Sequence, residues 1–374
     1  MGLSVALLAS AAAVSAGIVG VSGAQAAPQN PRPTLPPASQ ACGSGAYAVG
    51  YSDALDKVTT ADATLGGLSS LAYDRRSASW LSTVDNHASD PSRVWSFTDL
   101  AAPKVTGAPL VLKRPDGTAY DGKTADQEGL AVLPNGTYAI SSEAEPSIRI
   151  YSRAGVQQAS LPVPARFAVT GTTAAGEATS NATLESLTIT PNGHQIIAAM
   201  EGALSGDVSA AGDDGLHRFL VYGADGKGGW KLTKQVAYRT EPGARIPEIT
   251  AYRDNAVLVE EASFDAATGN SVKLFAVPGF DRAPDVSAIT DLSTAPVTSV
   301  AAKQAIVDVV ACPTLGAVAK QVQANPLMDN YEAMAVTAAP RPGSPLTEVA
   351  LVSDDNFGAT QITRVLRLAL RLPG

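Results

Sequence analysis

The sequence is poor in the residues on which many catalytic and metal sites depend. Its 374 residues include two cysteines and three histidines. It has no G-x-S-x-G, H-E-x-x-H, P-loop or G-x-G-x-x-G pattern, which argues against a serine-hydrolase elbow, a zincin, a nucleoside triphosphatase and a dinucleotide-binding fold. The histidines, His87, His194 and His217, are scattered, and His194 falls in a Pro-Asn-Gly-His turn where we expect it to be solvated.

Basic charge and a second long apolar run are also scarce. The formal net charge is −8, and it falls entirely on residues after position 26. This balance argues against nucleic acid or an anionic membrane as a partner, and it is compatible with a cation-binding surface. After residue 26 no stretch approaches the roughly 18 apolar residues needed to span a bilayer.

The first 26 residues have the features of a secretory signal peptide. Residues 3–21 are apolar and small, and Ala24-Gln25-Ala26 resembles a signal-peptidase site. No Lys or Arg precedes the apolar core, which an upstream start codon would explain, and the alternative is a membrane anchor. We expect a secreted, extracellular protein, soluble after cleavage and monomeric.

The two cysteines, Cys42 and Cys312, lie far apart in the sequence. In an exported chain they are expected to form one disulfide, and the alternative is two isolated thiols. Residues 27–45 are rich in proline near their start and are predicted to form an extended tether.

One sheet unit recurs through the rest of the chain. The stretch from Asp126 to Tyr151 divides into three short strands, at Gly129–Leu133, Tyr138–Ser142 and Ser147–Tyr151. Related stretches begin near positions 69, 128, 185, 248 and 332, with spacings of 59, 57, 63 and 84 residues. Repeats of this length indicate a propeller or a solenoid, and sheets this small bury their faces by packing around an axis.

The predicted fold is therefore all-β: a β-propeller of about five to six blades over residues 46–374. We expect a strand at Ala46–Tyr51 to complete the last sheet beside Ile362–Leu372 and so close the ring. The long interval before position 332 contains Ala-rich stretches with apolar residues at helical spacing. We therefore predict a small helical insertion at about residues 299–325.

The repeated acidic residues are the candidate site. Glu128, Glu185, Glu248 and Glu332 begin the first strands of four copies, whereas the first copy has Ser69 there. Further acids end the second strands: Glu143, Glu201, Glu260 or Glu261, and Asp354 or Asp355. In antiparallel pairs these two positions lie at the same end of a sheet, so the acids should converge at one mouth of the central channel.

A cluster of carboxylates requires either protonation or a cation, and an oxygen-rich site suits a hard ion such as Ca²⁺. The predicted metal ligands are Glu128, Glu185, Glu332, Asp354, Asp355 and Asp126. The predicted catalytic residues are Glu128, Glu143, Glu185 and Glu201, with Glu143 or Glu201 as the base. The predicted substrate-binding residues are Asn330, Asn356 and Glu261. The structural alternative is that repeated acids merely bind backbone N–H groups or cap turns.

Several of these stretches resemble a known family. D-Q-E-G-L-A from Asp126, E-S-L-T from Glu185, N-Y-E-A-M-A from Asn330 and V-S-D-D-N-F-G-A-T-Q-I-T from Val352 are similar to exported bacterial phytase-like proteins, the "esterase-like activity of phytase" family. The resemblance covers roughly residues 66–372. It implies a β-propeller and a phosphoester or carboxylester hydrolase activity.

Two positions depart from the family pattern: Ser69 replaces an acid, and Ala262 follows Glu260-Glu261 where the pattern has an arginine. The second departure removes a basic group that could meet a phosphate. An acidic pocket would then bind a phosphate ester only through cations, so metal-assisted hydrolysis is the expected mechanism. The alternatives are a calcium-dependent lactonase or sugar-ester hydrolase, and a non-catalytic propeller that binds a ligand or a protein.

Overall fold

The computed structural model describes residues 35–85 and 88–374. The predicted signal peptide, the first part of the tether and His87 lie outside these residues. The end of the predicted tether is ordered, because it contains a short 3₁₀ helix, η1 (Ala38–Gln40), and strand β1 (Ala41–Gly43). The folded domain therefore begins a few residues earlier than predicted. No helix of the described chain is long and apolar enough to cross a membrane.

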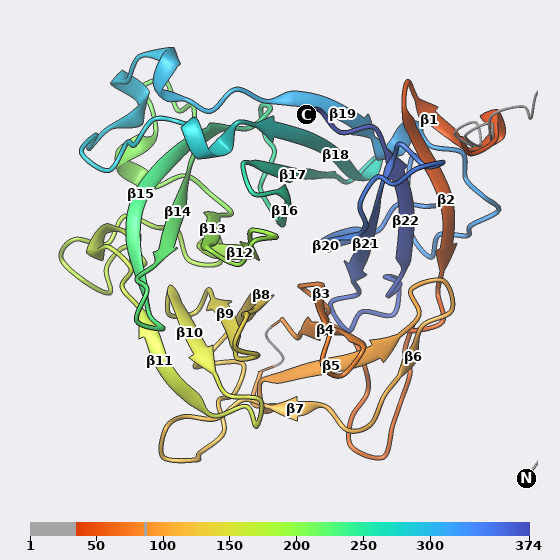
Figure 1. Cartoon of the computed structure of the whole chain (residues 1–374), viewed down its shortest axis with the longest axis horizontal. Helices are drawn as coiled ribbons and strands as arrows, with labels where there is room; N and C mark the ends of the chain where they lie inside the picture. The colour runs from red at the N-terminus through yellow and green to blue at the C-terminus, as the bar shows by residue number, and fades with distance from the viewer. Residues whose placement is uncertain (1–34, 86–87) are drawn as a thin grey trace, which may run out of the picture.

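Five antiparallel sheets surround a central axis, so the chain is a five-bladed propeller, as predicted (Figure 1). The strands of the first sheet are β3 (Ala72–Asp74), β4 (Ser79–Thr83), β5 (Arg93–Thr98), β6 (Lys104–Val105) and β7 (Leu110–Val111). The second sheet has β8 (Gln127–Val132), β9 (Tyr138–Ser142), β10 (Ser147–Tyr151) and β11 (Gln157–Leu161). The third has β12 (Leu184–Ile189), β13 (Gln195–Met200), β14 (Leu216–Ala224) and β15 (Trp230–Arg239).

The fourth sheet has β16 (Ile249–Arg253), β17 (Ala256–Asp265), β18 (Gly269–Pro278) and β19 (Gln304–Asp308). The fifth has β20 (Asn330–Ala338), β21 (Thr347–Asp354) and β22 (Val365–Leu370), followed by β2 (Ala46–Ser52) and β1. The innermost strands are β3, β8, β12, β16 and β20 (Figure 1).

The sequence of apolar and polar residues in a strand matches how deeply the strand is buried in its sheet. The innermost strands are buried on both faces, as in β8, whereas the outer β11 exposes most of its residues. The predictions for Tyr138–Ser142 and Ser147–Tyr151 coincide with β9 and β10. Continuous apolar runs thus mark inner strands, and more polar runs mark outer ones.

The core consists of layers between neighbouring sheets. One buried cluster joins the second and third sheets through side chains such as Ile148 and Ile196, and another joins the third and fourth through Phe219 and Val257. Equivalent clusters fill the gaps between the first and second, the fourth and fifth, and the fifth and first sheets. This confirms that each sheet buries its faces against its neighbours.

The ring closes through the two ends of the described chain. β2 pairs antiparallel with β22, with Tyr47 opposite Ala369, which confirms the predicted closure. The disulfide Cys42–Cys312 also forms as predicted. It joins the outer edge of the fifth sheet to the segment that follows β19 of the fourth.

The predicted helical insertion at residues 299–325 is wrong. No α-helix occurs in residues 35–85 or 88–374, and this region instead contains β19, the fourth strand of its sheet. Short 3₁₀ helices occur at the start of this region and within it, η6 (Val297–Ser299) and η7 (Val309–Ala311). Others occur in loops elsewhere: η2 (Ala165–Phe167), η3 (Ser205–Asp207), η4 (Phe280–Arg282) and η5 (Leu292–Thr294). The β-branched run around Ile306 favours a strand, and positive φ angles at Leu315 and Gly316 break any helix after it.

Candidate functional site

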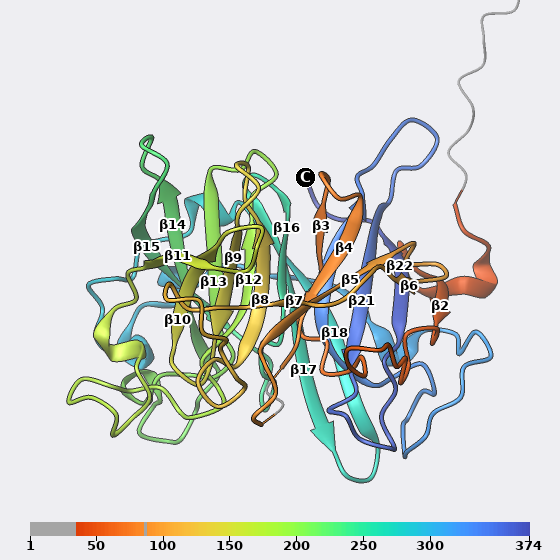
Figure 2. The same cartoon turned by 90° about the horizontal axis from the view of Figure 1, so that it is seen from below.

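The candidate site lies at one end of the central channel, where innermost strands begin and second strands end. The long β17–β18 hairpin projects beyond the other sheets at this end (Figure 2). A pocket of about 410 Å³ opens here, and its lining residues are Asp85, Glu128, Glu143, Asn181, Glu185, Glu201, Arg245, Glu332 and Asn356. We call the six carboxylates of this set, Asp85, Glu128, Glu143, Glu185, Glu201 and Glu332, the acidic mouth. Predicted acids of the second, third and fifth sheets thus meet here together with Asp85 of the first, whereas the predicted acids of the fourth sheet do not line the pocket.

Close packing of the innermost strands brings these acids together. Gly129 follows Glu128, and a Cβ atom there would lie 2.2 Å from the backbone nitrogen of Leu187 on β12. Any side chain at this position would push β8 away from β12. The glycine therefore allows Glu128 to approach Glu185, the matching acid of the next sheet.

The fourth sheet contributes its acids differently. Glu248 is buried and accepts hydrogen bonds from the backbone N–H groups of Ile249 (2.8 Å), Met334 and Leu187. It therefore ties three innermost strands together instead of lining the pocket. Glu260 is fully buried, and within the described chain neither of its carboxyl oxygens has a hydrogen-bond partner. Burial raises the pKa of both carboxyls well above the usual value.

Two predicted site residues are engaged elsewhere. Glu261 accepts hydrogen bonds from the Tyr238 hydroxyl (2.5 Å) and the Glu241 N–H (2.7 Å) and pairs with Lys303. Asp355 pairs with Lys57 and accepts a hydrogen bond from the Gly67 N–H (3.0 Å). Neither side chain lines the pocket.

The remaining predicted residues border the acidic mouth. Oxygens of Asp126 and Glu128 lie within 4.8 Å of each other and of an Asp85 oxygen. Asp354 is fully buried and accepts a hydrogen bond from the Asn356 N–H (2.7 Å). Burial first, and then the Glu332 and Asp85 carboxylates, raise the pKa of Asp354 well above its usual value.

Three lining residues were missed by the sequence prediction: Asp85, Asn181 and Arg245. Asp85 ends the second strand of the first copy, the position that Glu143 and Glu201 occupy in theirs, so alignment of the copies would have found it. Arg245 lies between β15 and β16, outside the repeated pattern, and no repeat marks it.

Arg245 also corrects the inference from Ala262. The backbone of Arg245 pairs with that of Ala262 through two hydrogen bonds of 2.9 and 3.0 Å. The arginine of the neighbouring segment therefore stands beside the position where the expected basic residue is absent. The pocket does contain a cation.

Arg245 is bound to one half of the acidic mouth. Its guanidinium lies 2.8 Å from Glu201 and 2.9 Å from Glu332, with Glu185 at 3.7 Å. It also donates to the Asn330 side-chain oxygen at 2.8 Å, and Asn330 donates to Glu332 at 3.0 Å. Asn330 thus holds the Arg245–Glu332 pair in position.

On the other side of the acidic mouth, no Lys or Arg within residues 35–85 and 88–374 pairs with Glu128 or Glu143. Carboxylate oxygens come within 4.8 Å of one another in two sets: Asp85 with Asp126 and Glu128, and Glu128 with Glu143 and Glu185. Burial first, and then these neighbouring charges, raise the pKa of Glu128 well above its usual value. Ser69 donates a hydrogen bond to Glu128, so the serine that replaces the acid of the first copy supports the acid of the second.

Glu143 has the properties of a proton carrier near neutral pH. Burial first, and then the Glu201 charge, raise its pKa to about 7. Its carboxyl accepts a hydrogen bond from the Thr183 N–H. A carboxyl whose pKa lies near neutrality is suited to accept and release a proton.

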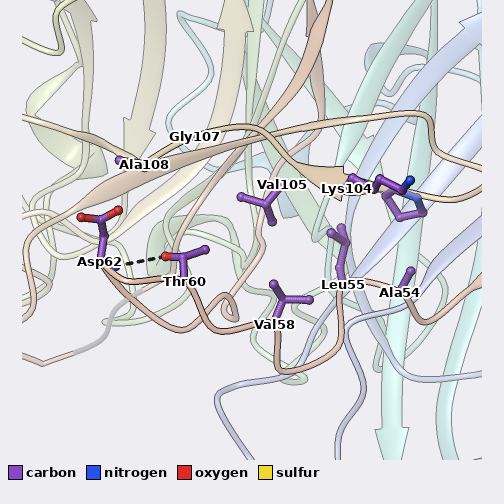
Figure 3. A pocket seen from close by; sticks show the side chains of 10 residues that line it. Ala54, Leu55, Val58, Thr60, Asp62, Lys104, Val105, Gly107 and Ala108 are labelled. Atoms are coloured by element: carbon purple, nitrogen blue, oxygen red, sulfur yellow. Dashed lines mark hydrogen bonds between the residues drawn. The ribbon is translucent and has the colours of Figure 1, made fainter.

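A larger cavity on the periphery has weaker site chemistry. It measures about 580 Å³ and lies between the segments around Leu55 and Val105 (Figure 3). Its two charged lining residues, Asp62 and Lys104, lie toward opposite ends of the cavity (Figure 3). The convergent polar groups therefore favour the acidic mouth as the functional site.

Comparison with known proteins identifies a family. A family model described as "Phytase-like: Esterase-like activity of phytase" matches residues 63–357. A search of the curated proteins gives no match. Among solved structures, an α-L-arabinofuranosidase from Podospora anserina in complex with cellotriose is 9% identical, with a TM-score of 0.44, and the match covers 85% of this chain and 95% of that one.

Two further structures give similar values. A Dyadobacter fermentans protein of unknown function is 12% identical, has a TM-score of 0.43, and the match covers 87% of this chain and 100% of that one. The periplasmic gluconolactonase of Pseudomonas aeruginosa is 10% identical, has a TM-score of 0.35, and the match covers 82% and 86%. Because these TM-scores lie below 0.5, the likenesses carry no argument about function.

Proposed function

Because this chain belongs to the phytase-like family described by an esterase-like activity, we propose that it hydrolyses ester bonds at the acidic mouth. The observation that carries the proposal is the close grouping of carboxylates in this pocket: oxygens of Glu128, Glu143 and Glu185 lie within 4.8 Å of one another, beside the pairs of Arg245 with Glu201 and Glu332. Such a group provides a place for a cation beside a residue able to move a proton.

The two carboxylate sets around Glu128 fit Ca²⁺ by their donor chemistry. Every ligand atom in the two carboxylate sets is a carboxylate oxygen, which suits a hard cation rather than a thiolate- or imidazole-preferring metal. The residues that would hold the ion are Asp85, Asp126, Glu128 and Glu185, which leaves Glu143 free to act as the base. The more distant predictions Glu332, Asp354 and Asp355 become secondary, because Glu332 and Asp355 already have cationic partners. A bound Ca²⁺ would neutralise charge on the substrate and lower the pKa of a water molecule.

The chain's own residues supply the remaining steps. Glu143 takes a proton from the attacking water, since its pKa of about 7 leaves it partly ionised at neutral pH. Glu201 is the less suitable base, because its carboxylate is bound by Arg245 at 2.8 Å. Asn181 and Asn356 provide amide groups in the pocket lining that can orient a bound substrate.

One observation favours an uncharged ester, such as a lactone or sugar ester, over a phosphate ester. The single cationic residue of the described lining, Arg245, is already engaged with Glu201, Glu332 and Asn330. An anionic substrate would meet carboxylates without a free cationic side chain. It would have to rely on bound ions.

The test is a hydrolysis assay on nitrophenyl phosphate, nitrophenyl acetate and a sugar lactone, with calcium and with excess chelator. Glu143→Gln should lower turnover about 10²- to 10⁴-fold, because it removes the general base. Glu145→Gln is the matched control, since the Glu145 side chain is exposed and pairs with Arg149 at 2.9 Å. It should retain full activity.

Full activity of Glu143→Gln would contradict the assignment of the base, and full activity in chelator would contradict the calcium site. No turnover on any ester together with no calcium binding by calorimetry would favour the non-catalytic propeller.

We also propose that the protein is exported. The Cys42–Cys312 disulfide supports this, because disulfides persist mainly in oxidising compartments. Fractionation of cells and medium tests it.

A further inference from the structure

The central channel has a second pocket at the end opposite the acidic mouth. It measures about 400 Å³ and is lined by residues of all five innermost strands, including Ala72, Leu130, Leu187, Thr250 and Met334. We call it the distal pocket. Its size lies within the range of pockets that bind small molecules.

The distal pocket is separate from the acidic mouth. The two pockets have no described lining residue in common. Between them Glu248 is hydrogen-bonded to backbone N–H groups of β12 and β20, and Gly129 lets β8 approach Leu187 closely. A ligand in the distal pocket would therefore not contact the proposed hydrolytic residues.

Most side chains that line the distal pocket are apolar, and a single one is charged. Leu130, Leu187, Ile249 and Met334 form part of it, and Arg75 is the one charged residue of the described lining. An apolar wall with one cationic group at its edge matches a molecule with an apolar body and one negative charge.

Aromatic side chains lie beside this arginine. Tyr73 and Trp80 are cross-strand partners, their ring centroids are 5.0 Å apart, and both line the pocket. The Tyr73 side chain is 44% exposed, an unusual state for a large ring at the entrance of a pocket. Exposed aromatic surface of this kind is a common feature of binding sites.

Arg75 is available for a ligand, in contrast to the arginine that follows it. Within residues 35–85 and 88–374 no hydrogen bond or ion pair engages the Arg75 guanidinium, whereas Arg76 donates to the Pro134 carbonyl at 3.2 Å. The carboxylate of the preceding residue, Asp74, pairs with Arg153 at 2.8 Å and not with Arg75.

We propose that the distal pocket binds a small amphipathic organic anion, an acyl or aromatic carboxylate or sulfonate. Its apolar part lies in the channel between the innermost strands and against Tyr73 and Trp80. Its anionic group pairs with Arg75. This site is independent of the proposed hydrolytic activity.

The test uses the full mature chain and anilinonaphthalene sulfonate, an aromatic anion whose fluorescence rises in apolar surroundings. Arg75→Gln should weaken binding about tenfold, the usual effect of losing one charge-assisted hydrogen bond. Tyr73→Ala should weaken it as well. Arg76→Gln, which removes the same charge one residue away, should change the affinity less than twofold.

Competition by molecules of equal chain length tests the charge requirement. Octanoate should displace the dye, octanol should do so more weakly, and octylamine should be the weakest. Equal loss of affinity in Arg75→Gln and Arg76→Gln, or equal competition by octylamine and octanoate, would overturn the proposal. Binding to anionic vesicles without displacement of the dye by octanoate would also overturn it, in favour of a membrane contact.

Discussion

Replacing Arg245 with methionine should destabilise the folded protein at alkaline pH and much less at acidic pH. The substitution removes the cation that lies 2.8 Å from Glu201, 2.9 Å from Glu332 and 3.7 Å from Glu185. It leaves the three carboxylates in a pocket that already carries an excess of negative charge.

The magnitude follows from the burial of the partners. Removing one member of a buried ion pair usually costs about 3–5 kcal/mol, whereas exposed pairs contribute about 0–1 kcal/mol. The Arg245 side chain is 30% exposed and the Glu201 and Glu332 side chains are 12% and 10% exposed, so the pair lies between these limits. We expect a loss of about 2–3 kcal/mol in the free energy of unfolding at pH 8.

The sign of the pH dependence follows from proton linkage. Without Arg245 the folded-state pKa of Glu201, which burial already raises, rises further, while the unfolded value stays at about 4.3. The folded variant then binds protons more readily than the unfolded chain as pH falls. The deficit should therefore be largest at pH 8 and should shrink to below about 1 kcal/mol near pH 5.

Urea denaturation of the wild type and the variant at both pH values, in chelator, measures this. Arg239→Met is the matched control, because Arg239 and Asp213 form a pair of 2.8 Å whose side chains are 47% and 51% exposed. It should cost less than about 1 kcal/mol at either pH. A deficit for Arg245→Met that is equal at pH 8 and pH 5, or no larger than that of the control, would refute the reasoning.

Three further predictions concern the fold. Gly129→Ala should lower the free energy of unfolding by at least about 2 kcal/mol, because its Cβ would lie 2.2 Å from the Leu187 nitrogen. Gly43→Ala is the control, since the space around Gly43 is open. Equal losses for the two variants in urea denaturation would contradict this. Burial lowers the pKa of His217 to about 4. The lowered pKa does not affect stability above about pH 6.5, where His217 is neutral in both states, but it destabilises the folded state by up to about 3.4 kcal/mol as pH falls from 6.5 to 4. The stability difference between wild type and His217→Asn should therefore vary with pH in that window, and a constant difference would exclude it. Cys42→Ser should lower the unfolding free energy by about 2–5 kcal/mol because the disulfide spans 270 residues; calorimetry showing an unchanged melting temperature would contradict this.

The sequence predicted the repeated parts of the fold well. The five copies, the closing pair of β2 with β22, and the meeting of Glu128, Glu143, Glu185 and Glu201 all follow from a pattern that occurs several times. A repeated pattern is informative because each copy constrains the interpretation of the others.

The parts outside the repeat were not predictable in the same way. Residues 299–325 have helix-like spacing of apolar residues, but their place beside the exposed edge of β18 selects a strand. Arg245 reaches the acidic mouth from a loop between two sheets, and its role depends on contacts with residues 44 and 87 positions away. Periodicity contains no signal for such contacts.

The equivalent positions of the five copies also show how a symmetric ring acquires an asymmetric site. Ser69 donates to Glu128, Glu248 bonds backbone N–H groups across the axis, and Glu332 pairs with Arg245. The same position of the repeat is thus a hydrogen-bond donor to an acid in one copy, a link between strands in another and an ion-pair partner in a third.

These differences leave the uncompensated charge on one side of the ring, around Glu128 and Glu143. If all five positions carried equivalent free carboxylates, their charge would be spread evenly around the mouth. The departures from the repeat, rather than the repeat itself, therefore define where a cation and a substrate would bind.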